Sequence, residues 1–497
     1  MSGLILSIDE GTTGISVMVF DQDASVRGRA YAELSQYYPR PGWVEHDPEE
    51  IWGLTRSLAE AALGGAGAAS ADLAGIGITN QRETAVLWER STGRAVAPAI
   101  VWQCRRSAAI CERLRSEGLE DELGKRTGLV LDPYFSASKI LWYLENVDGV
   151  RERAEAGELA FGTVDSWLIW KLTGGACHVT EPSNASRTML YSLDEGTWDG
   201  WILDRLGIPE SLLPEIRPSA GAFGETAGDV LGGRAVPICG VAGDQQAALF
   251  GQACFERGMA KNTYGTGSFV LMNTGERVTS GHGLLSSAAW DLGEGVRYVL
   301  EGSIFVTGAA IQWLRDGLGI IGAAAEAGPL AESVPDAGGT YLVPAFTGLG
   351  APQWDPYARG AYVGITRGTT RAHLTRAAVE AMAFQTRDVV EAMAADSGTG
   401  LAELRVDGGA SVMDLLCQFQ ADQLGVVVRR AAMAETTALG AAYMAGLAAG
   451  VWDSPRDISE RWSVDAEFAP KASRDEADAR YDGWKRAVER AKGWAEA

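Results

Sequence analysis

The sequence predicts an α/β protein built from two related domains. Short apolar runs alternate with amphipathic stretches along the chain, which indicates strands and helices arranged in layers. A Gly-Thr turn between two apolar runs occurs in SIDEGTTGISVMVFD (7–21) and again in MAKNTYGTGSFVLMNTG (259–275). The 497 residues also exceed what one core usually supports. The expected domains are residues 1–250 and 251–497.

The first Gly-Thr stretch is expected to form a β-hairpin, because apolar residues alternate on both sides of the turn at residues 10–14. The glycines allow unusual backbone angles, and Thr12 and Thr13 add hydroxyls beside exposed amides. Such a concave run of donors suits an anion such as a phosphate, and Asp9 would face the accompanying cation. Taken alone, the stretch rather favours an ordinary Gly-containing hairpin, because short glycine motifs often match by accident.

The elements that follow alternate between helices and strands. A helix is expected to start after Asp47, which is followed by a proline and two glutamates. Residues 73–79 and 84–89 are predicted strands on either side of a short polar segment. Residues 164–174 are a predicted helix that ends in glycine, and GGAGAAS (64–70) is a predicted surface loop.

The second half continues this alternation. Residues 235–244 are a predicted strand that leads into a helix, and LRVDGGAS (404–411) is expected to end a strand and begin the next helix. The Gly-Gly pair would then place backbone amides at a helix N-terminus, unless it only permits close packing. Residues 438–452 are a predicted buried helix, too short for a membrane span, and an amphipathic helix is expected from Ser473 onward.

Composition excludes several classes of function. Lys and Arg number 43 against 65 Asp and Glu, and the net charge of −22 opposes non-specific binding to nucleic acid or anionic membranes. The six cysteines and four histidines are scattered, which disfavours zinc, a disulfide framework and a Ser-His-Asp triad. No secretory signal is apparent, so a cytoplasmic location is expected.

Four motifs, NQRET, VWQCRR, DPYFSASK and GDQQAALFGQ, closely resemble those of the glycerol kinases in the FGGY family of carbohydrate kinases. The resemblance runs from PGWVEHDPEEIW to TALGAAY. It implies two ribonuclease H-like domains of the actin-like ATPase type with a ligand cleft between them. The N-terminal domain would hold the acceptor site and first phosphate loop, and the C-terminal domain the nucleotide site. The implied activity is a transferase reaction of glycerol catabolism, the phosphorylation of glycerol by ATP to sn-glycerol 3-phosphate and ADP.

The resemblance also implies an acceptor site. The residues that would hydrogen-bond the three hydroxyls are Arg82, Glu83, Tyr134, Asp244 and Gln245, and those that would pack on the carbon backbone are Trp102 and Phe269. A small triol needs several such partners, because polar groups left unpaired by a wrong substrate are costly. Without the other motifs, Arg82 and Glu83 could equally be a structural ion pair, and Trp102 a core residue.

Catalytic and nucleotide roles carry over in the same way. Asp244 is expected to be the catalytic base, a role compatible with capping the helix that follows it. Mg²⁺ would be held mostly by phosphate oxygens and water, with Asp9 and Asp244 nearby. The positions expected to contact ATP are Thr12, Thr13, Gly14, Thr266, Gly308, Gln312, Gly409 and Met413. A homodimer or homotetramer is a possible assembly.

The chain departs from the family's pattern at three places. Ser16 stands where most glycerol kinases have an Arg that approaches the transferring phosphate, Met413 where they often have Asn, and Ala235 where a regulatory Arg is expected. Either another basic residue substitutes for that Arg or the protein is slow. The alternatives are therefore an FGGY kinase for another polyol or a ketose, and a weakly catalytic regulator that binds nucleotide and polyol. Inhibition by fructose 1,6-bisphosphate is not expected.

Overall fold

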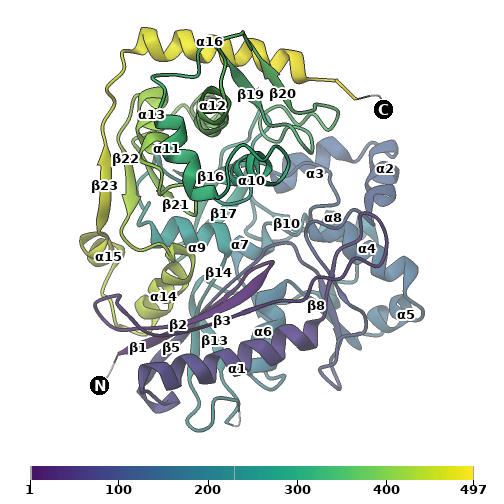
Figure 1. The fold of residues 1–497 in the computed structure, drawn as a ribbon. Coiled ribbons are helices and arrows are strands. Elements are labelled where there is room, and N and C mark those ends of the chain that lie inside the picture. The colour runs from purple at the N-terminus through teal and green to yellow at the C-terminus, as the bar shows by residue number, and fades with distance from the viewer. Residues whose placement is uncertain (1–2, 229, 496–497) are drawn as a thin grey trace. The chain divides into compact units, whose positions relative to one another are not determined.

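The computed structural model describes residues 3–228 and 230–495, which group into two compact units (Figure 1). The first unit is the chain up to Ala253 together with Ser286–Tyr298 and Glu435–Trp462. The second comprises Cys254–Leu285, Val299–Ala434 and the chain from Ser463 on. Each large sheet is described below by itself.

The first sheet has six strands in the order β13-β14-β5-β1-β2-β3. Their bounds are β1 (Leu4–Glu10), β2 (Gly14–Phe20), β3 (Val26–Glu33), β5 (Leu73–Asn80), β13 (Ala220–Glu225) and β14 (Pro237–Gly243). β1 pairs antiparallel with β2, which confirms the predicted hairpin, and parallel with β5. β5 in turn runs parallel to β14. The carboxyl ends of β1, β5 and β14 therefore meet at one edge of the sheet.

Helices pack against this sheet. Their bounds are α1 (Pro48–Ala66), α6 (Val164–Leu172), α9 (Asp244–Gly251) and α14 (Thr436–Ala448). Asp47 caps α1 by accepting a hydrogen bond from the Glu49 amide at 2.9 Å. α14 is almost wholly buried, as predicted, and the Ser7 hydroxyl of β1 donates to its Ala438 carbonyl at 2.6 Å. The first sheet is thus buried against a helix from a late part of the chain.

The start of the expected loop at residues 64–70 is helical instead. α1 continues through Ala66 and ends at Gly67, which has the left-handed φ of 63°. Extending an existing helix gains one hydrogen bond per residue, so two glycines do not stop it, whereas a left-handed glycine does.

The second sheet has seven strands in the order β17-β18-β16-β15-β21-β22-β23. Their bounds are β15 (Met259–Tyr264), β16 (Ser268–Gly275), β17 (Leu285–Asp291), β18 (Val296–Ile304), β21 (Glu403–Asp407), β22 (Val428–Ala431) and β23 (Val464–Phe468). β15 pairs antiparallel with β16 and parallel with β21, then β21 runs parallel to β22 and β22 antiparallel to β23. The first sheet repeats this succession in β2-β1-β5-β14-β13. The two halves are therefore built on the same plan.

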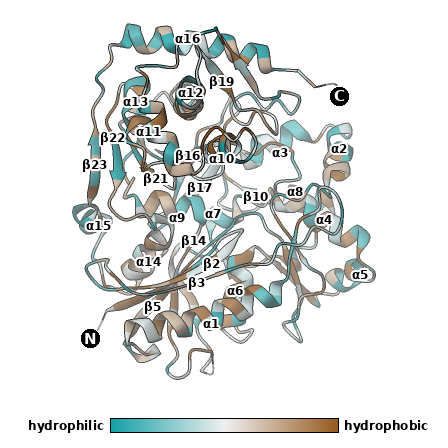
Figure 2. Ribbon diagram, viewed as in Figure 1, coloured by the Kyte–Doolittle hydropathy of each residue, from teal (hydrophilic) through white to brown (hydrophobic). Residues whose placement is uncertain are grey.

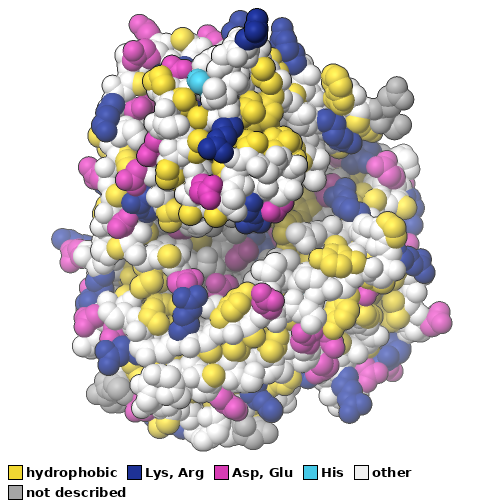
Figure 3. Space-filling model, in the orientation of Figure 1, with side chains coloured by type: hydrophobic (Ala, Val, Ile, Leu, Met, Phe, Trp, Pro, Cys, Tyr) yellow, Lys and Arg dark blue, Asp and Glu magenta, His cyan; other side chains and the backbone are white. Residues whose placement is uncertain are grey.

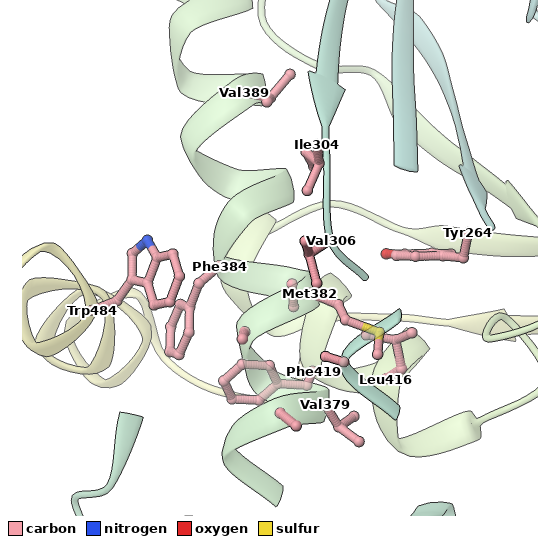
Figure 4. Packing of buried hydrophobic residues seen from close by; sticks show 14 of the residues in the cluster. Tyr264, Ile304, Val306, Val379, Met382, Phe384, Val389, Leu416, Phe419 and Trp484 are labelled. Atoms are coloured by element: carbon pink, nitrogen blue, oxygen red, sulfur yellow. The ribbon is translucent and has the colours of Figure 1, made fainter. Parts of the chain in front are cut away.

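The core of the second unit forms around α12 (Arg371–Ser397). Figure 4 shows Phe384 of α12 between Phe419 of α13 (Asp414–Leu424) and Trp484 of α16 (Arg474–Ala491). The Phe384 and Trp484 rings stack with centroids 5.5 Å apart. Ser473 caps α16 and confirms the predicted terminal helix, which is mostly hydrophilic in Figure 2, whereas the strands near β5 are hydrophobic.

The remaining elements complete the two units. Those of the first half are β4 (Glu45–His46), β6 (Val86–Glu89), β7 (Ala99–Ile100), α2 (Ala108–Ser116), α3 (Glu120–Thr127), α4 (Ser136–Asn146), α5 (Val150–Glu155), β8 (Leu159–Gly162), β9 (Val179–Thr180), α7 (Pro182–Ala185), β10 (Tyr191–Ser192), β11 (Thr197–Trp198), α8 (Gly200–Leu206) and β12 (Glu215–Ile216). Those of the second half are α10 (Gly308–Asp316), α11 (Ala327–Glu332), β19 (Tyr341–Val343), β20 (Ala361–Val363) and α15 (Pro455–Arg461).

Within residues 3–228 and 230–495, no helix has both the length and the apolar character needed to cross a membrane. Acidic and basic side chains are interspersed over the face seen in Figure 3.

Candidate functional site

The predicted residues of the first unit gather where three parallel strands end. Glu10 of β1 pairs with Asn80 of β5, and Asn80 pairs with Gly243 of β14. Asp9 lies at this edge, Asp244 directly follows β14, and Arg82 follows the end of β5 by two positions. The carboxyl ends of parallel strands are the usual place for ligands in open α/β sheets.

The turn between β1 and β2 is held in shape by hydrogen bonds to its carbonyls. The Thr12 carbonyl accepts from Gln36 Nε2 at 2.6 Å, and the Thr13 carbonyl accepts from the Leu34 amide at 3.0 Å. The amides of Thr12 and Thr13 donate to no residue that the structure describes. The turn therefore offers free donors to an anion, as the sequence predicts.

An aromatic pair connects this turn with the acceptor residues. Trp102 Nε1 donates to Thr12 Oγ1 at 2.8 Å, and the Trp102 and Tyr134 rings meet edge to face at 5.5 Å. Arg187 lies over the Tyr134 ring at 5.4 Å, and its Nε donates to Glu83 Oε1 at 2.6 Å. One chain of contacts thus runs from the Gly-Thr turn to Glu83.

Arg82 and Asp244 form the second part of the cluster. Arg82 Nε lies 3.1 Å from Asp244 Oδ1, and the Arg82 side chain is buried. Asp244 is the first residue of α9, and the Gln245 amide donates to its Oδ1 at 2.7 Å. The Asp244 side chain remains 28% exposed, so an oriented carboxylate faces the outside of the unit.

Two features of this cluster have no clear signal in the sequence. Glu83 has a φ of +62°, an unusual conformation for a non-glycine residue and one that tends to cluster at active sites. Arg187 is completely buried and makes a salt bridge with Glu83, yet sequence reasoning assigned it no role. Its only signal is its place in the NASRTML motif.

The cluster is rich in carboxylates. Desolvation, followed by the charges of Asp244 and Glu435, raises the pKa of Asp9 to about 7. Burial is also the main reason that the pKa of Glu10 lies well above its usual value. A divalent cation would relieve this repulsion. The described residues contain no group of three or more metal-ligating side chains. Mg²⁺ usually takes one or two carboxylates together with phosphate oxygens and water.

In the second unit, the turn between β15 and β16 packs on the start of α10. The amides of Thr307 and Ala309 donate to the Thr266 carbonyl at 2.9 and 3.0 Å, and the Gly308 amide donates to the Gly265 carbonyl at 3.0 Å. Thr266 is exposed. Gln312 is also exposed and follows Gly308 by four positions, so both lie on one face of α10.

The Gly-Gly turn lies at the end of the neighbouring strand. Gly408 has a φ of +84°, and a Cβ there would lie 2.4 Å from the Tyr264 carbonyl oxygen, so only glycine fits. The strand and the helix expected here are confirmed as β21 and α13, but α13 begins only at Asp414, so two successive turns separate it from Gly409. In the first turn the Ser411 amide donates to the Gly408 carbonyl at 3.2 Å, and in the second the Met413 amide donates to the Ala410 carbonyl at 3.1 Å. These hydrogen bonds form in place of a first helical turn.

The two remaining predicted residues are half-buried in the second unit. Met413 directly precedes α13 without capping it by a side-chain hydrogen bond, and it packs close to Gly328 of α11. Phe269 lies in β16 opposite Thr263 of β15. Their contacts with ligands stay predictions.

Comparisons with known proteins agree on one family. The N-terminal domain model of the FGGY family of carbohydrate kinases matches residues 4–251, and its C-terminal domain model matches residues 260–449. Glycerol kinase of Halorhodospira halophila is 57% identical over 491 residues, covering 99% of this chain and 97% of that protein. Glycerol kinase of Petrotoga mobilis is 56% identical over 497 residues and covers 100% of both chains.

Solved structures give the same result. The crystal structure of Plasmodium falciparum glycerol kinase with ADP aligns with a TM-score of 0.94 and 34% identity, over 99% of this chain and 98% of that one. Gluconate kinase from Lactobacillus acidophilus, at 19% identity and a TM-score of 0.89 over 99% of both chains, shows the same fold. The chain therefore belongs to the FGGY family of carbohydrate kinases.

Proposed function

We propose that the protein transfers the terminal phosphoryl group of ATP to glycerol, giving ADP and sn-glycerol 3-phosphate. The observation that carries this proposal is the cluster of Arg82, Glu83, Trp102, Tyr134 and Asp244 beside the Gly-Thr turn of one unit. Relatives that match the chain over its full length and are more than half identical to it are glycerol kinases.

The cluster suits a small triol. Arg82, Tyr134 and Gln245 offer hydrogen-bond donors, while Glu83 and Asp244 offer acceptors. Trp102 provides apolar surface for the carbon chain, and Phe269 of the second unit stays a proposed apolar contact. The salt bridges of Arg82 with Asp244 and of Arg187 with Glu83 fix these polar groups in place. A substrate that leaves one of them without a hydrogen bond binds more weakly, which favours glycerol over a polyol or ketose of another shape.

ATP is the proposed donor. The amides of the first turn suit its phosphates, and Thr266, Gly308, Gln312 and Gly409 are the proposed contacts of the second unit. Met413 offers a polarisable apolar surface for a purine but no matching hydrogen bond. The solved glycerol kinase structure described above contains ADP.

Asp244 is the proposed general base. Its carboxylate takes the proton of the terminal hydroxyl as that oxygen forms a bond to the γ-phosphorus and the bond from phosphorus to the ADP oxygen breaks. Arg82 keeps the carboxylate oriented through the 3.1 Å contact. Asp9 and Asp244 are the proposed holders of Mg²⁺, which when bound neutralises charge on the phosphates.

Location and assembly complete the proposal. All six cysteines are free, which suits a reducing compartment such as the cytoplasm. A homodimer or homotetramer is the proposed assembly.

A coupled assay of ADP release tests the function. Glycerol, erythritol, xylulose and no acceptor are compared at millimolar ATP. Stimulation by glycerol well above the other acceptors is expected. Preference for xylulose or erythritol would indicate another polyol or ketose kinase, and nucleotide binding without stimulation by any acceptor would indicate a regulator. Either result would overturn the proposal.

A further inference from the structure

Tyr31 lies across the phosphate turn of the first unit. It belongs to β3 and pairs directly with Ser16 of β2, which pairs in turn with Asp9 of β1. Residues paired in this way project from the same face of a sheet, so all three side chains share one face. A Cβ placed on Gly14 would lie only 2.5 Å from the Tyr31 hydroxyl and 2.7 Å from its Cε2. The phenol therefore extends along the hairpin to the last residue of the turn.

Two small residues leave room for this ring. Any side chain at position 14 would displace the Tyr31 hydroxyl, and a long side chain at position 16 would compete with the ring for the same face. The Ser16 hydroxyl is buried and has no hydrogen-bond partner among the described residues, so Ser16 does not itself reach a ligand. Gly14, Ser16 and Tyr31 thus form one packing unit, and its outermost polar group is the phenol.

The Tyr31 hydroxyl is available to a ligand. The side chain is 54% exposed, and its hydroxyl makes no hydrogen bond to any residue in the described part of the chain. Arginines near this face already have carboxylate partners, since Arg82 contacts Asp244 at 3.1 Å and Arg29 contacts Glu435 at 2.9 Å. A phosphate at the turn therefore meets the phenol as a hydrogen-bond donor, beside two arginines that already have carboxylate partners.

We propose that Tyr31 is a catalytic residue whose hydroxyl donates a hydrogen bond to a non-bridging oxygen of the phosphoryl group in transfer. This inference rests on the proposed function. During the step the terminal hydroxyl oxygen of glycerol bonds to phosphorus, its proton goes to Asp244, and the bond to the ADP oxygen breaks. Tyr31 keeps its proton and stabilises the negative charge that the phosphoryl oxygens carry.

The first test compares Tyr31→Phe with Tyr38→Phe, a matched loss of a hydroxyl from an exposed side chain outside the turn. Tyr31→Phe is expected to lower kcat roughly 10- to 100-fold, the effect of losing one donor to a charged group. KM for glycerol and the melting temperature should not change, since the ring remains. Tyr38→Phe should match wild type. A kcat for Tyr31→Phe within about twofold of wild type would overturn the inference.

A second variant tests whether a cation can replace the phenol. Ser16→Arg alone should leave kcat unchanged or raise it, because it places a cation on the same face as Tyr31. The double variant Ser16→Arg/Tyr31→Phe should then have a kcat less than about threefold below that of Ser16→Arg. If loss of the hydroxyl lowers kcat as much in the Ser16→Arg background as in wild type, the phenol and the cation act independently. The cation would then not replace the phenol at the phosphoryl group, which would overturn the inference.

Calorimetry with ATP and ADP separates this inference from the proposed function. Tyr31→Phe is expected to weaken ATP binding roughly 2- to 10-fold and to leave ADP binding unchanged, because only ATP carries the transferred group. If wild type shows no turnover with glycerol but ATP binding still depends on Tyr31, the proposed function fails and the contact stands. If wild type turns over glycerol and neither kcat nor ATP binding depends on Tyr31, the contact alone fails.

Discussion

At the scale of single residues, the side chains of the candidate site in the first unit are held in place by contacts with their neighbours. Glu83 is held by Arg187 at 2.6 Å, Arg82 contacts Asp244 at 3.1 Å, and Trp102 is tied to Thr12 at 2.8 Å. Fixed partners lower the entropy lost on binding a small substrate. Under the proposed function, such preorganisation is what would let a few polar groups discriminate among small polyols.

Asp244→Asn is expected to lower kcat by roughly 10²- to 10⁴-fold, the usual contribution of a general base. Asn keeps the size of the side chain and one acceptor oxygen, so glycerol binding measured by calorimetry should remain detectable. Asp148→Asn, at an exposed position away from the strand ends, is the control and should match wild type. Survival of kcat within about tenfold would assign the base elsewhere.

Among the residues, local patterns predicted more than long-range contacts did. The hairpin turn, its threonines and the strand-end Asp9 follow from a few consecutive letters, and the structure places them together. Glu83 has a left-handed conformation and contacts Arg187, which lies 104 positions away in the chain. Tyr31 reaches Gly14 only because β3 pairs with β2 in one register. No local pattern fixes such contacts, because they depend on strand pairing and burial.

At the scale of elements, strand ends and turns position the proposed ligand contacts. Both sheets use a hairpin followed by a parallel neighbour, so each hairpin turn lies at an edge where the next strand also ends. In the second sheet this brings the turn after Tyr264 next to Gly408. The repeat was predictable from two similar stretches of sequence, whereas the exact start of α13 was not, because turn hydrogen bonds compete with the first helical turn.

Gly408→Ala should destabilise the second unit more than Gly409→Ala. Alanine at Gly408 would carry a left-handed φ, which costs about 1–2 kcal/mol, and would meet the Tyr264 carbonyl oxygen at 2.4 Å. A Cβ at Gly409 meets nothing within 4 Å, which makes it the matched control. Denaturant midpoints of the two variants check this. Equal midpoints would mean that the backbone at Gly408 moves away without cost.

The contact of α16 with α12 should depend on pH through Asp388. Its buried carboxylate accepts hydrogen bonds from Tyr481, Trp484 and Gln353 at 2.6, 2.9 and 3.3 Å. Burial outweighs these bonds and raises its pKa from 3.8 to about 6. The folded state therefore binds a proton that the unfolded state has released, and the stability from this group is lost as pH rises through about 6.

Asp388→Asn tests this assignment, because asparagine does not titrate. The free energy of unfolding of wild type minus that of the variant should fall between about pH 4 and pH 6 and then level off. Denaturation followed at several pH values supplies the measurement, with Asp482→Asn on the exposed side of α16 as control. A difference that rises over this range would show that hydrogen bonding, not burial, dominates at Asp388.

At the scale of the whole molecule, the order of the chain does not match the order of the units. The first unit contains α14 and α15 from residues Glu435–Trp462, which follow most of the second unit in sequence. The family and the two-sheet plan were predictable from motifs in order along the chain. The return of the chain to the first unit at residues 435–462 was not predictable, because the sequence of an apolar helix does not indicate which sheet the helix packs against.

A fragment that ends at Ala253 is therefore expected not to fold. It would lack α14, whose helix is buried and accepts a hydrogen bond from Ser7 of β1, and so expose one apolar face of the first sheet. Such a face on an isolated unit favours aggregation. Joining residues 435–462 to the fragment through a flexible linker restores the covering helix and should recover a cooperative thermal transition. Calorimetry of the two fragments measures the thermal transition, and size-exclusion chromatography measures their aggregation. If the shorter fragment is monomeric and unfolds in a cooperative thermal transition, α14 contributes little to the stability of the sheet it covers.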